Sequence, residues 1–580
     1  MKEARLSSSE QPKYMIRETQ NELSSAWKFY LGIGPEKQAL VVLDGFTTLP
    51  LSLARNCGHV VVYGLKKPEM ALLQSLAVAK QISNYSCVNE LDNLATQFDI
   101  IVLATTDKLQ SDQKRMFEEI RKFVHAKTEI WMIVVNDFSL DRAKSLVYSI
   151  AKRVKRESGE LKQEEKAVRM QFTRQALMRL RDARNYMHSI GCRPFAEVGL
   201  MPSMKRLRLA RPMKDDRMES LNGVALNRIQ RLTVGEIAIG ATPSRSNQSF
   251  LERILREIPE CGLKNGRLHN YRVSSSGKVL LFASYRGRGA AREVIIKLPL
   301  NEFSQYRLQL NHDILDYLAQ STQIGDSRAA YFPRPLCSGS FERQPLFVED
   351  ILPGKSGDQL AISKKDRERI YHEIFSFWLS LQQSLARTYY LDAPAFNKMI
   401  HKPLDRLFAL FHKMDAAGAV QDRIRDLLQQ SFLEKQISLS LIHGDFSLKN
   451  IILDASLLTL QGIVDWDLAH KASFPILDLF HFFVRAQRGS YKKSPLEMLW
   501  RMIEKPEAHP EFHQFLKLYC EAFGIDRRSL PAYVILYWIQ RISAHLGTMK
   551  VLDKKFMKRN YYDALKLFDK HFFSAIENVT

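Results

Sequence analysis

Two short apolar stretches in the C-terminal half of the chain each run into polar residues, and this pattern constrains the fold more than any other feature. The stretch SLSLI leads into His443-Gly444-Asp445, and Asn450 opens the next apolar segment, NIILD. Asp465 comes later, at the end of the apolar run GIV. Short apolar runs of this kind are typical of buried strands. If these strands pair, Asp445, Asn450 and Asp465 lie near neighbouring strand ends.

Phosphoryl transfer needs this set of groups. One carboxylate orients an attacking hydroxyl and accepts its proton. An amide oxygen and a second carboxylate hold Mg²⁺, which prefers hard oxygen ligands and keeps several waters. The structural alternative is that Asp445 caps a turn and that Asp465 only ends a strand. The combined spacing favours the catalytic interpretation.

The segment from about residue 267 to residue 478 resembles the aminoglycoside phosphotransferase and choline kinase-like family. The HGDxxxxN loop of that family matches residues 443–450, its IDWE-type metal motif matches VDWD at 464–467, and a later acid matches PILDL at 475–479. The resemblance implies a bilobal, α+β protein-kinase-like phosphotransferase domain with a largely helical C-lobe. It implies Asp445 as the catalytic base, Asn450 and Asp465 as Mg²⁺ ligands, and His443 and Asp478 as residues that brace the loop.

The similarity is closest to family members with an HGDF-x-PWN loop and a PxxDLFHF segment, which tend to occur in bacterial surface-glycan gene sets. Leu448 and Lys449 replace the Pro-Trp of that loop. The cation of Lys449 could contact phosphate or an anionic acceptor, or it could point to solvent.

The preceding residues fit the small lobe of such a fold. Residues 268–299 predict three strands joined by turns at SSSG and RGRGAAR. A kinase-like lobe places a Lys on its third strand against the nucleotide phosphates, and Lys297 has this position among apolar neighbours. Ser276 and Gly277 of the first turn could cover the phosphates, although an ordinary hairpin turn is equally consistent. Residues 347–354 resemble the hinge that meets adenine, which makes Glu349 and Ile351 further ATP-binding candidates.

The partner of Lys297 is the main departure from the family pattern. The helix after the Lys strand normally offers a Glu, but the aligned position is Asn311, with Asp313 nearby. Asp313 or Glu302 could take that role. A weakened pair would instead favour a nucleotide-binding pseudokinase that acts as a scaffold.

The N-terminal part predicts a parallel α/β sheet. Apolar runs at 39–45, 59–65, 98–106 and 129–137 alternate with helical patterns, and such runs are typical of strands buried on both faces. CRPFAEVGL and KRLRLARPM predict a closing pair of strands. Together these residues resemble a Rossmann-like, class I methyltransferase-like domain.

Cofactor binding by this domain stays an open alternative. Phosphate- or cofactor-binding versions place glycines after the first strand. Here the turn reads Asp44-Gly45-Phe46, and Tyr63-Gly64 stands where an acid would bind ribose. Asp44 is the candidate residue for S-adenosylmethionine, and a scaffold or partner-binding role is the other interpretation.

Charge suggests anionic partners without identifying one. The net charge is +22, and a basic balance favours anionic partners. Residues 138–190 predict a charged, solvated helix or helix pair. The basic stretch Lys205, Arg206, Arg208 and Arg211 could contact an anionic glycan, lipid or nucleotide, or could be an exposed strand. No specific nucleic-acid module is recognisable.

The remaining features indicate a cytoplasmic protein. Six scattered cysteines without a CxxC pair predict reduced thiols rather than a zinc site or disulfides. The N-terminus lacks an apolar signal core, and no apolar run reaches the length of a membrane span.

The predicted organisation is therefore multidomain. The expected parts are a polar segment at 1–30, a Rossmann-like domain at 31–213, a connector at 214–266, a kinase-like N-lobe at 267–345 and a helical C-lobe at 346–580. The predicted function is ATP- and Mg²⁺-dependent transfer of a phosphoryl group to a hydroxyl of an unknown small molecule or glycan. The alternatives are a nucleotide-binding pseudokinase and a bifunctional protein that also binds S-adenosylmethionine.

Overall fold

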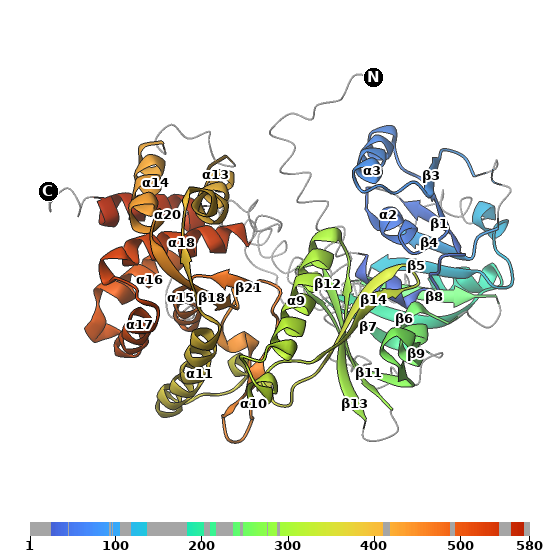
Figure 1. The fold of residues 1–580 in the computed structure, drawn as a ribbon. Coiled ribbons are helices and arrows are strands. Elements are labelled where there is room, and N and C mark those ends of the chain that lie inside the picture. The colour runs from blue at the N-terminus through green and yellow to red at the C-terminus, as the bar shows by residue number, and fades with distance from the viewer. Residues whose placement is uncertain are drawn as a thin grey trace, which may run out of the picture. The chain divides into compact units, whose positions relative to one another are not determined.

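The computed structural model describes most of the chain (Figure 1). The described residues are 25–43, 46–91, 94, 97–104, 118–135, 183–201, 209–215, 236–243, 248–274, 276–286, 291–409, 418–487, 494–544 and 558–573. They divide into two compact units, which we call the N-terminal unit (within Tyr14–Gln305 and Leu336–Asp350) and the C-terminal unit (within Tyr306–Pro335 and Ile351–Thr580).

An eight-stranded sheet organises the first part of the N-terminal unit, in the order β3-β2-β1-β4-β5-β8-β6-β7. Its strands are β1 (Gln38–Leu43), β2 (His59–Tyr63), β3 (Tyr85–Val88), β4 (Ile100–Ala104), β5 (Glu129–Val135), β6 (Arg193–Met201), β7 (Leu209–Asp215) and β8 (Glu236–Thr242). The first five strands pair in parallel. All four predicted apolar runs are strands of this sheet, so the predicted α/β Rossmann-like class is confirmed.

Strand β8 was not expected. It lies within the predicted connector, yet it pairs antiparallel with both β5 and β6. Its sequence, EIAIGAT, is short and rich in small residues, because the sheet face is crowded there. A Cβ added at Gly240 would lie 2.8 Å from the Phe195 ring and 2.9 Å from the Trp131 ring. The predicted closing pair, β6 and β7, is present and antiparallel.

Short helices accompany this sheet. They are η1 (Ala26–Tyr30), α2 (Leu49–Ala54), α3 (Lys67–Ala79), α8 (Phe250–Arg256) and η4 (Pro259–Cys261). Helix α8 begins at a capping box in which Ser249 and Glu252 satisfy each other's backbone N–H groups. Most of the charged helical segment predicted at 138–190 lies outside the described residues.

The second sheet of the N-terminal unit has five strands in the order β11-β12-β13-β15-β14. Their bounds are β11 (Gly266–Ser274), β12 (Lys278–Tyr285), β13 (Arg292–Pro299), β14 (Pro335–Phe341) and β15 (Gln344–Asp350), and a small hairpin, β9 (Glu257–Ile258) with β10 (Leu263–Lys264), precedes them. The three strands predicted at 268–299 are β11, β12 and β13, and they pair antiparallel.

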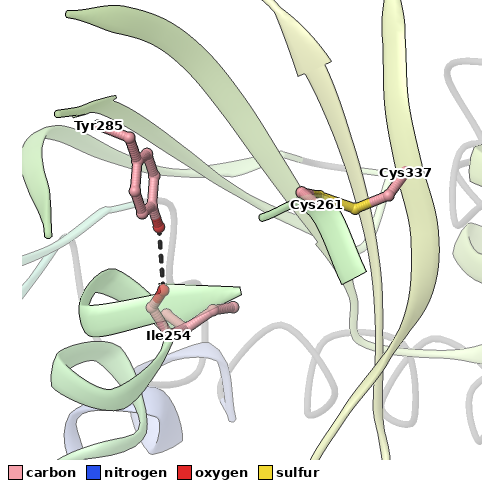
Figure 2. The surroundings of a disulfide bond; sticks show 4 residues. All are labelled: Ile254, Cys261, Tyr285 and Cys337. Atoms are coloured by element: carbon pink, nitrogen blue, oxygen red, sulfur yellow. Dashed lines mark hydrogen bonds between the residues drawn. A yellow bond between two sulfur atoms is a disulfide. The ribbon is translucent and has the colours of Figure 1, made fainter. Parts of the chain in front are cut away.

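Specific bonds tie this sheet to earlier segments of the chain. The Tyr285 hydroxyl donates to the Ile254 carbonyl of α8 at 2.9 Å, and Cys261 forms a disulfide with Cys337 of β14 (Figure 2). The prediction that all cysteines are reduced is therefore wrong for this pair. The two residues are 76 positions apart, and sequence alone does not reveal pairings over such distances.

One hydrophobic core spans both sheets of the N-terminal unit. It contains Trp27, Val41 and Phe250 together with Tyr271 and Ile296 of the five-stranded sheet. The division into units therefore differs from the predicted boundary at residue 267, because the small-lobe strands bury their apolar face in the same core as the α/β sheet.

The C-terminal unit is mainly helical, and its elements match the predicted C-lobe. Its helices are α10 (Asp326–Ala329), α11 (Lys364–Leu385), α12 (Ala393–Phe396), α13 (Lys402–Ala409), α14 (Gly418–Phe432), α15 (Ile476–Ala486), α16 (Pro495–Glu504), α17 (Pro510–Phe523), α18 (Leu530–Ser543) and α20 (Asp563–Phe568), and α9 (Glu302–Gln320) follows β13. Its short helical turns are η5 (Gly357–Gln359), η6 (Asn397–His401), η8 (Leu448–Asn450), η9 (Pro506–Ala508), η10 (Arg527–Ser529), η12 (Lys558–Tyr562) and η13 (Asp569–Phe573).

Two three-stranded sheets carry the polar motifs of this unit, in the orders β16-β19-β20 and β17-β18-β21. The strands are β16 (Lys355–Ser356), β17 (Arg387–Tyr390), β18 (Gln436–Ile442), β19 (Ile451–Leu453), β20 (Leu460–Ile463) and β21 (His470–Ser473). Within the described ranges, no helix combines the length and the apolar character that a membrane crossing requires.

Candidate active site

The loop after β18 holds the predicted catalytic base in a defined network. One carboxylate oxygen of Asp445, Oδ1, lies 2.8 Å from His481 Nε2 and 3.5 Å from an Arg541 guanidinium nitrogen. The other, Oδ2, accepts a hydrogen bond from Asn450 Nδ2 at 3.2 Å. His481 lies on α15 and Arg541 on α18, so two helices of the C-terminal unit position this carboxylate.

These contacts keep Asp445 ionised. Burial alone would raise the pKa of its carboxyl, but the hydrogen bond from His481 and the charge of Arg541 outweigh burial and hold the pKa well below its usual value. The Asp445 side chain is still 24% exposed. A hydroxyl-bearing molecule can therefore reach a carboxylate that is charged at neutral pH.

His481 is neutral in this arrangement. Burial, helped by the Arg541 charge, lowers the pKa of His481 to about 4. Its Nε2–H therefore donates to Asp445, and its Nδ1 accepts from the Tyr537 hydroxyl at 3.0 Å. The hydrogen bond from Tyr537 thus favours the tautomer in which the proton is on Nε2 and is donated to Asp445.

The start of the loop is anchored by a buried acid. The backbone N–H groups of His443 and Gly444 donate to the two carboxylate oxygens of Asp478, at 2.7 and 2.9 Å. Burial raises the pKa of Asp478 to about 6, although the nearby His443 ring and both N–H groups act in the opposite direction. The His443 ring donates from Nε2 to the Val464 carbonyl at 3.0 Å and accepts the Asp445 N–H at Nδ1. These bonds connect the start of the loop to Asp478 of α15 and to Val464.

Gly444 is required by its surroundings. Its φ is +77°, and a Cβ there would lie 2.1 Å from the Leu468 carbonyl oxygen. Only glycine combines this backbone conformation with such a close approach. The glycine of the HGD motif thus brings the two polar loops together.

The two predicted metal ligands lie on these joined loops. Asn450 is buried at the end of η8, and its amide nitrogen donates to the carbonyl and to the carboxylate of Asp445. The Val464 N–H donates to the Asn450 carbonyl at 2.9 Å and so links this loop to the one that carries Asp465. The amide oxygen of Asn450 and the carboxylate of Asp465 are hard donors of the kind that Mg²⁺ prefers.

Asp465 has an unusual backbone conformation. Its φ is +67°, in the left-handed region. Non-glycine residues seldom adopt this region, although Asp is enriched in it, and such residues cluster at functional sites. The next residue is held by α9, because Asn311 Oδ1 accepts the Trp466 N–H at 2.9 Å. Among the described residues, no group of three or more His, Cys, Asp or Glu side chains is placed to hold a metal ion.

Lys297 forms an ion pair, but not with any of the predicted partners. Its ammonium lies 2.5 Å from Glu349 Oε1, and both side chains are buried. The predicted partners make other contacts: Asn311 binds Trp466, Asp313 accepts from Gln309, and Glu302 pairs with Arg55. Strands β13 and β15 are adjacent, so Glu349 faces Lys297 diagonally across the sheet. The family pattern places this acid on the helix after the Lys strand, so it does not indicate a strand residue such as Glu349.

The other residues predicted to bind ATP, which are Ser276, Gly277 and Ile351, make contacts that do not point to a nucleotide. The Ser276 N–H donates to Ser274 Oγ, and the Gly277 N–H donates to the Ser274 carbonyl. Both donors are thus used inside the hairpin turn, which gives the phosphate-covering interpretation no geometric support. Ile351 is half-buried directly after β15, at the end of the hinge-like segment's strand.

The Leu448-Lys449 variation has a local structural explanation. The Ser356 hydroxyl donates to the Lys449 carbonyl at 2.6 Å, and Leu448 packs against the core of the C-terminal unit. The Lys449 side chain is exposed.

The sequence motifs did not indicate His481, Arg541 or Arg307. Arg307 on α9 is buried, and its guanidinium lies 3.9 Å from Asp467 of the VDWD motif. All three lie far from the catalytic motif in sequence. The signal that could have found His481 is its position within DLFHF, one helical turn after Asp478.

Most N-terminal candidates fall outside the described residues. These are Asp44, Lys205, Arg206 and Arg208; only the backbone of Arg211 is described, on β7. Gly64, after β2, has a φ of +93°, and a Cβ there would lie 2.1 Å from the Leu43 carbonyl oxygen. Close packing between neighbouring strands therefore explains this glycine.

Comparison with known proteins agrees with the motif. Residues 280–516 match the model of the phosphotransferase enzyme family. This match confirms the resemblance stated from sequence and the predicted class of enzyme. No curated protein matches the chain.

Solved structures resemble each part at low identity. An aminoglycoside-3'-phosphotransferase of type VIII is 17% identical, covering 44% of this chain and 87% of its own, with a TM-score of 0.30. An aminoglycoside phosphotransferase from Streptomyces rimosus is 16% identical, covering 50% and 97%, with a TM-score of 0.31. A SAM-dependent methyltransferase from Thermotoga maritima is 13% identical, covering 41% and 94%, with a TM-score of 0.25.

Proposed function

We propose that the protein transfers the γ-phosphoryl group of ATP to a hydroxyl of a small molecule or glycan in a Mg²⁺-dependent reaction. The observation that supports this most is the Asp445 carboxylate, which is ionised, partly exposed and hydrogen-bonded to Asn450. An acid in this state beside a metal-type donor set suits phosphoryl transfer, and the family match of residues 280–516 supports the same class.

Asp445 orients the acceptor hydroxyl in this proposal. A carboxylate with a lowered pKa is a weak base, so it accepts the hydroxyl proton late, when the bond to phosphorus is forming. His481 and Arg541 hold the carboxylate in place and ionised. Most of the rate enhancement then comes from positioning and charge stabilisation.

Asn450 and Asp465 would hold the metal. Magnesium supplies charge neutralisation on the phosphate oxygens when it is bound there. The backbone link from Val464 to Asn450 fixes the spacing of the two loops. Lys297 is proposed to bind the α- and β-phosphates, and Glu349 and Ile351 lie on the segment proposed to meet adenine.

The cellular setting is part of the proposal. Use of ATP as donor fits a cytoplasmic location, and an acceptor from surface-polysaccharide metabolism fits the HGDF and DLFHF segments. The boundaries 267–345 and 346–580 for the two lobes are proposed on the same basis.

A nucleotide-binding pseudokinase is the second candidate. The observation that favours it is the pairing of Lys297 with Glu349 of β15 instead of a helix acid. Binding of ATP without transfer to any acceptor would distinguish it. Binding of S-adenosylmethionine by the N-terminal domain is a further alternative, testable by calorimetry with that cofactor.

The deciding experiment is a transfer screen with γ-labelled ATP and metabolites from a cell extract. The wild-type chain is expected to label an acceptor, and Asp445→Ala and Asp465→Ala are expected to label none. Asp454→Ala, a half-buried acid in the turn between β19 and β20, serves as the control. Full labelling by both site variants would show that the catalytic assignment is wrong.

A further inference from the structure

A cavity of about 570 Å³ lies within the N-terminal unit. Five segments line it: Lys28 of η1; Ala54, Arg55 and Gly58 at and after the end of α2; residues 80–84 after α3; residues 299–302 and Gln305, from the end of β13 into α9; and residues 343–345 at the start of β15. None of the residues predicted to act in catalysis, metal binding or ATP binding is among them.

The lining of this cavity is cationic. Lys28, Arg55, Lys80 and Arg343 contribute four positive charges, and Glu302 contributes one negative charge. A concave wall with charges of one sign concentrates counter-ions, because the field lines converge inside it. The cavity is therefore suited to an anion.

Lys28 places one of these charges at a buried position. Its side chain is almost completely buried, and its ammonium donates to the Ser52 carbonyl at 3.0 Å and to Asn56 Oδ1 at 2.7 Å. A buried ammonium is stabilised by an adjacent anion more strongly than an exposed one, because the surroundings screen less.

The polar groups beside Lys28 have unused capacity. Ser52 Oγ and Asn56 Nδ2 are buried, and neither has a hydrogen-bond partner within the described ranges. Buried polar atoms without partners are uncommon and call for an explanation. Neither residue lines the cavity, but both contact Lys28, which does.

Arg55 is held at the side of the cavity. Its guanidinium donates to the Leu300 carbonyl at 3.1 Å and lies 3.4 Å from Glu302, whose side chain is 74% exposed. An exposed pair at this distance is weak. A ligand with several anionic oxygens would compete well for the same guanidinium, since Arg binds phosphate through paired hydrogen bonds.

We propose that this cavity is a second binding site, for a phosphate-bearing small molecule. Its volume lies in the range of small-molecule sites, about 300–1,000 Å³. The bound phosphate would lie beside residues 299–302, the segment that follows the strand of Lys297.

The test uses inorganic pyrophosphate as the probe, titrated calorimetrically into the full chain in the presence of EDTA. The double variant Lys80→Gln/Arg343→Gln removes two lining charges. It is expected to weaken binding by roughly a hundredfold, about tenfold per charge-assisted contact. The matched control is Lys67→Gln/Arg272→Gln, which removes two exposed charges that do not line the cavity and is expected to change affinity less than about threefold.

A further variant separates this site from the phosphotransferase site. Lys297→Met is expected to leave unchanged the pyrophosphate binding that Lys80→Gln/Arg343→Gln weakens, and to remove only any separate binding event at the phosphotransferase site. The proposal is overturned if no saturable binding occurs, if both double variants lose affinity equally, or if Lys297→Met abolishes binding. Thermal unfolding of each variant without ligand checks that it is folded.

Discussion

At the scale of single residues, the environment of Asp445 explains why its carboxyl stays ionised although it is largely buried. It combines a hydrogen bond from a neutral histidine, a nearby guanidinium and partial exposure. Sequence indicated the acid and its amide neighbour. It could not indicate His481 or Arg541, because their proximity depends on how α15 and α18 pack.

We predict that His481→Phe moves the acid limb of the pH profile of kcat/KM to higher pH. The lowered pKa of Asp445 depends on the hydrogen bond from His481, so burial raises that pKa once the donor is lost. As pH is lowered, the variant therefore loses activity at a higher pH than the wild type does. At neutral pH kcat/KM should drop about tenfold, the typical value of a hydrogen bond to a charged group. His372→Phe, an exposed histidine on α11, should leave the profile unchanged, and an identical profile for His481→Phe would refute this role.

Gly444→Ala should destabilise the C-terminal unit strongly. The new Cβ would meet the Leu468 carbonyl at 2.1 Å in addition to the left-handed backbone, so we expect a cost above about 2 kcal/mol. Gly524→Ala is the matched control, because its φ is +65° but nothing lies within 4 Å of the added Cβ. That change should cost about 1 kcal/mol. Urea denaturation of both variants compares them, and equal costs would contradict the packing explanation.

Asp478 should make stability depend on pH. Its pKa is about 6 in the folded chain and roughly 4 when unfolded, so the folded state binds the proton more tightly. The contribution of Asp478 to the free energy of unfolding is therefore fully present below pH 4 and is lost as pH rises to about 6. The change is on the order of 3 kcal/mol. Asp478→Asn lacks this titration. Its free energy of unfolding should therefore fall further below that of the wild type at pH 4.5 than at pH 7. Asp313→Asn, an exposed acid on α9, is the control, and a deficit that is the same at both pH values would contradict the prediction.

At the scale of elements, the strands were more predictable than their partners. The apolar runs of β1, β2, β4 and β5 give a strong local signal. Strand β8 gives a weak strand signal, because it contains small residues such as Gly240, where the rings of Phe195 and Trp131 leave no room for a larger side chain. The Lys297–Glu349 pair and the Cys261–Cys337 bond both depend on strand neighbours, which local patterns do not encode.

The disulfide should be detectable as a thiol count and as a loss of stability on reduction. The denatured, unreduced chain should show four free thiols, those of Cys57, Cys87, Cys192 and Cys520. Cys337→Ser opens a loop of 76 positions, for which chain entropy gives on the order of 4 kcal/mol. Thermal unfolding should thus shift down in this variant but little in Cys87→Ser. A count of six thiols without reductant would contradict the bond.

At the scale of the whole molecule, the sequence indicated the two kinds of fold and the class of enzyme, but not how the small-lobe strands are buried. Their apolar face shares a core with the α/β sheet. The N-terminal unit therefore does not end at residue 267, where the kinase-like N-lobe was predicted to begin, but includes these strands. Periodicity identifies which face of a strand is apolar, but it does not say what covers that face. For the same reason, the cationic cavity formed by five separate segments has no local sequence signal.

The central claim is that Asp445 acts on the acceptor while Asn450 and Asp465 act on the metal and nucleotide. The most direct test measures ATP affinity and phosphoryl transfer side by side in Asp445→Asn. We predict that the Kd for ATP with Mg²⁺ stays within about threefold of wild type, while transfer falls by roughly a thousandfold or more. Full transfer by this variant, or loss of ATP binding in parallel with transfer, would contradict the claim.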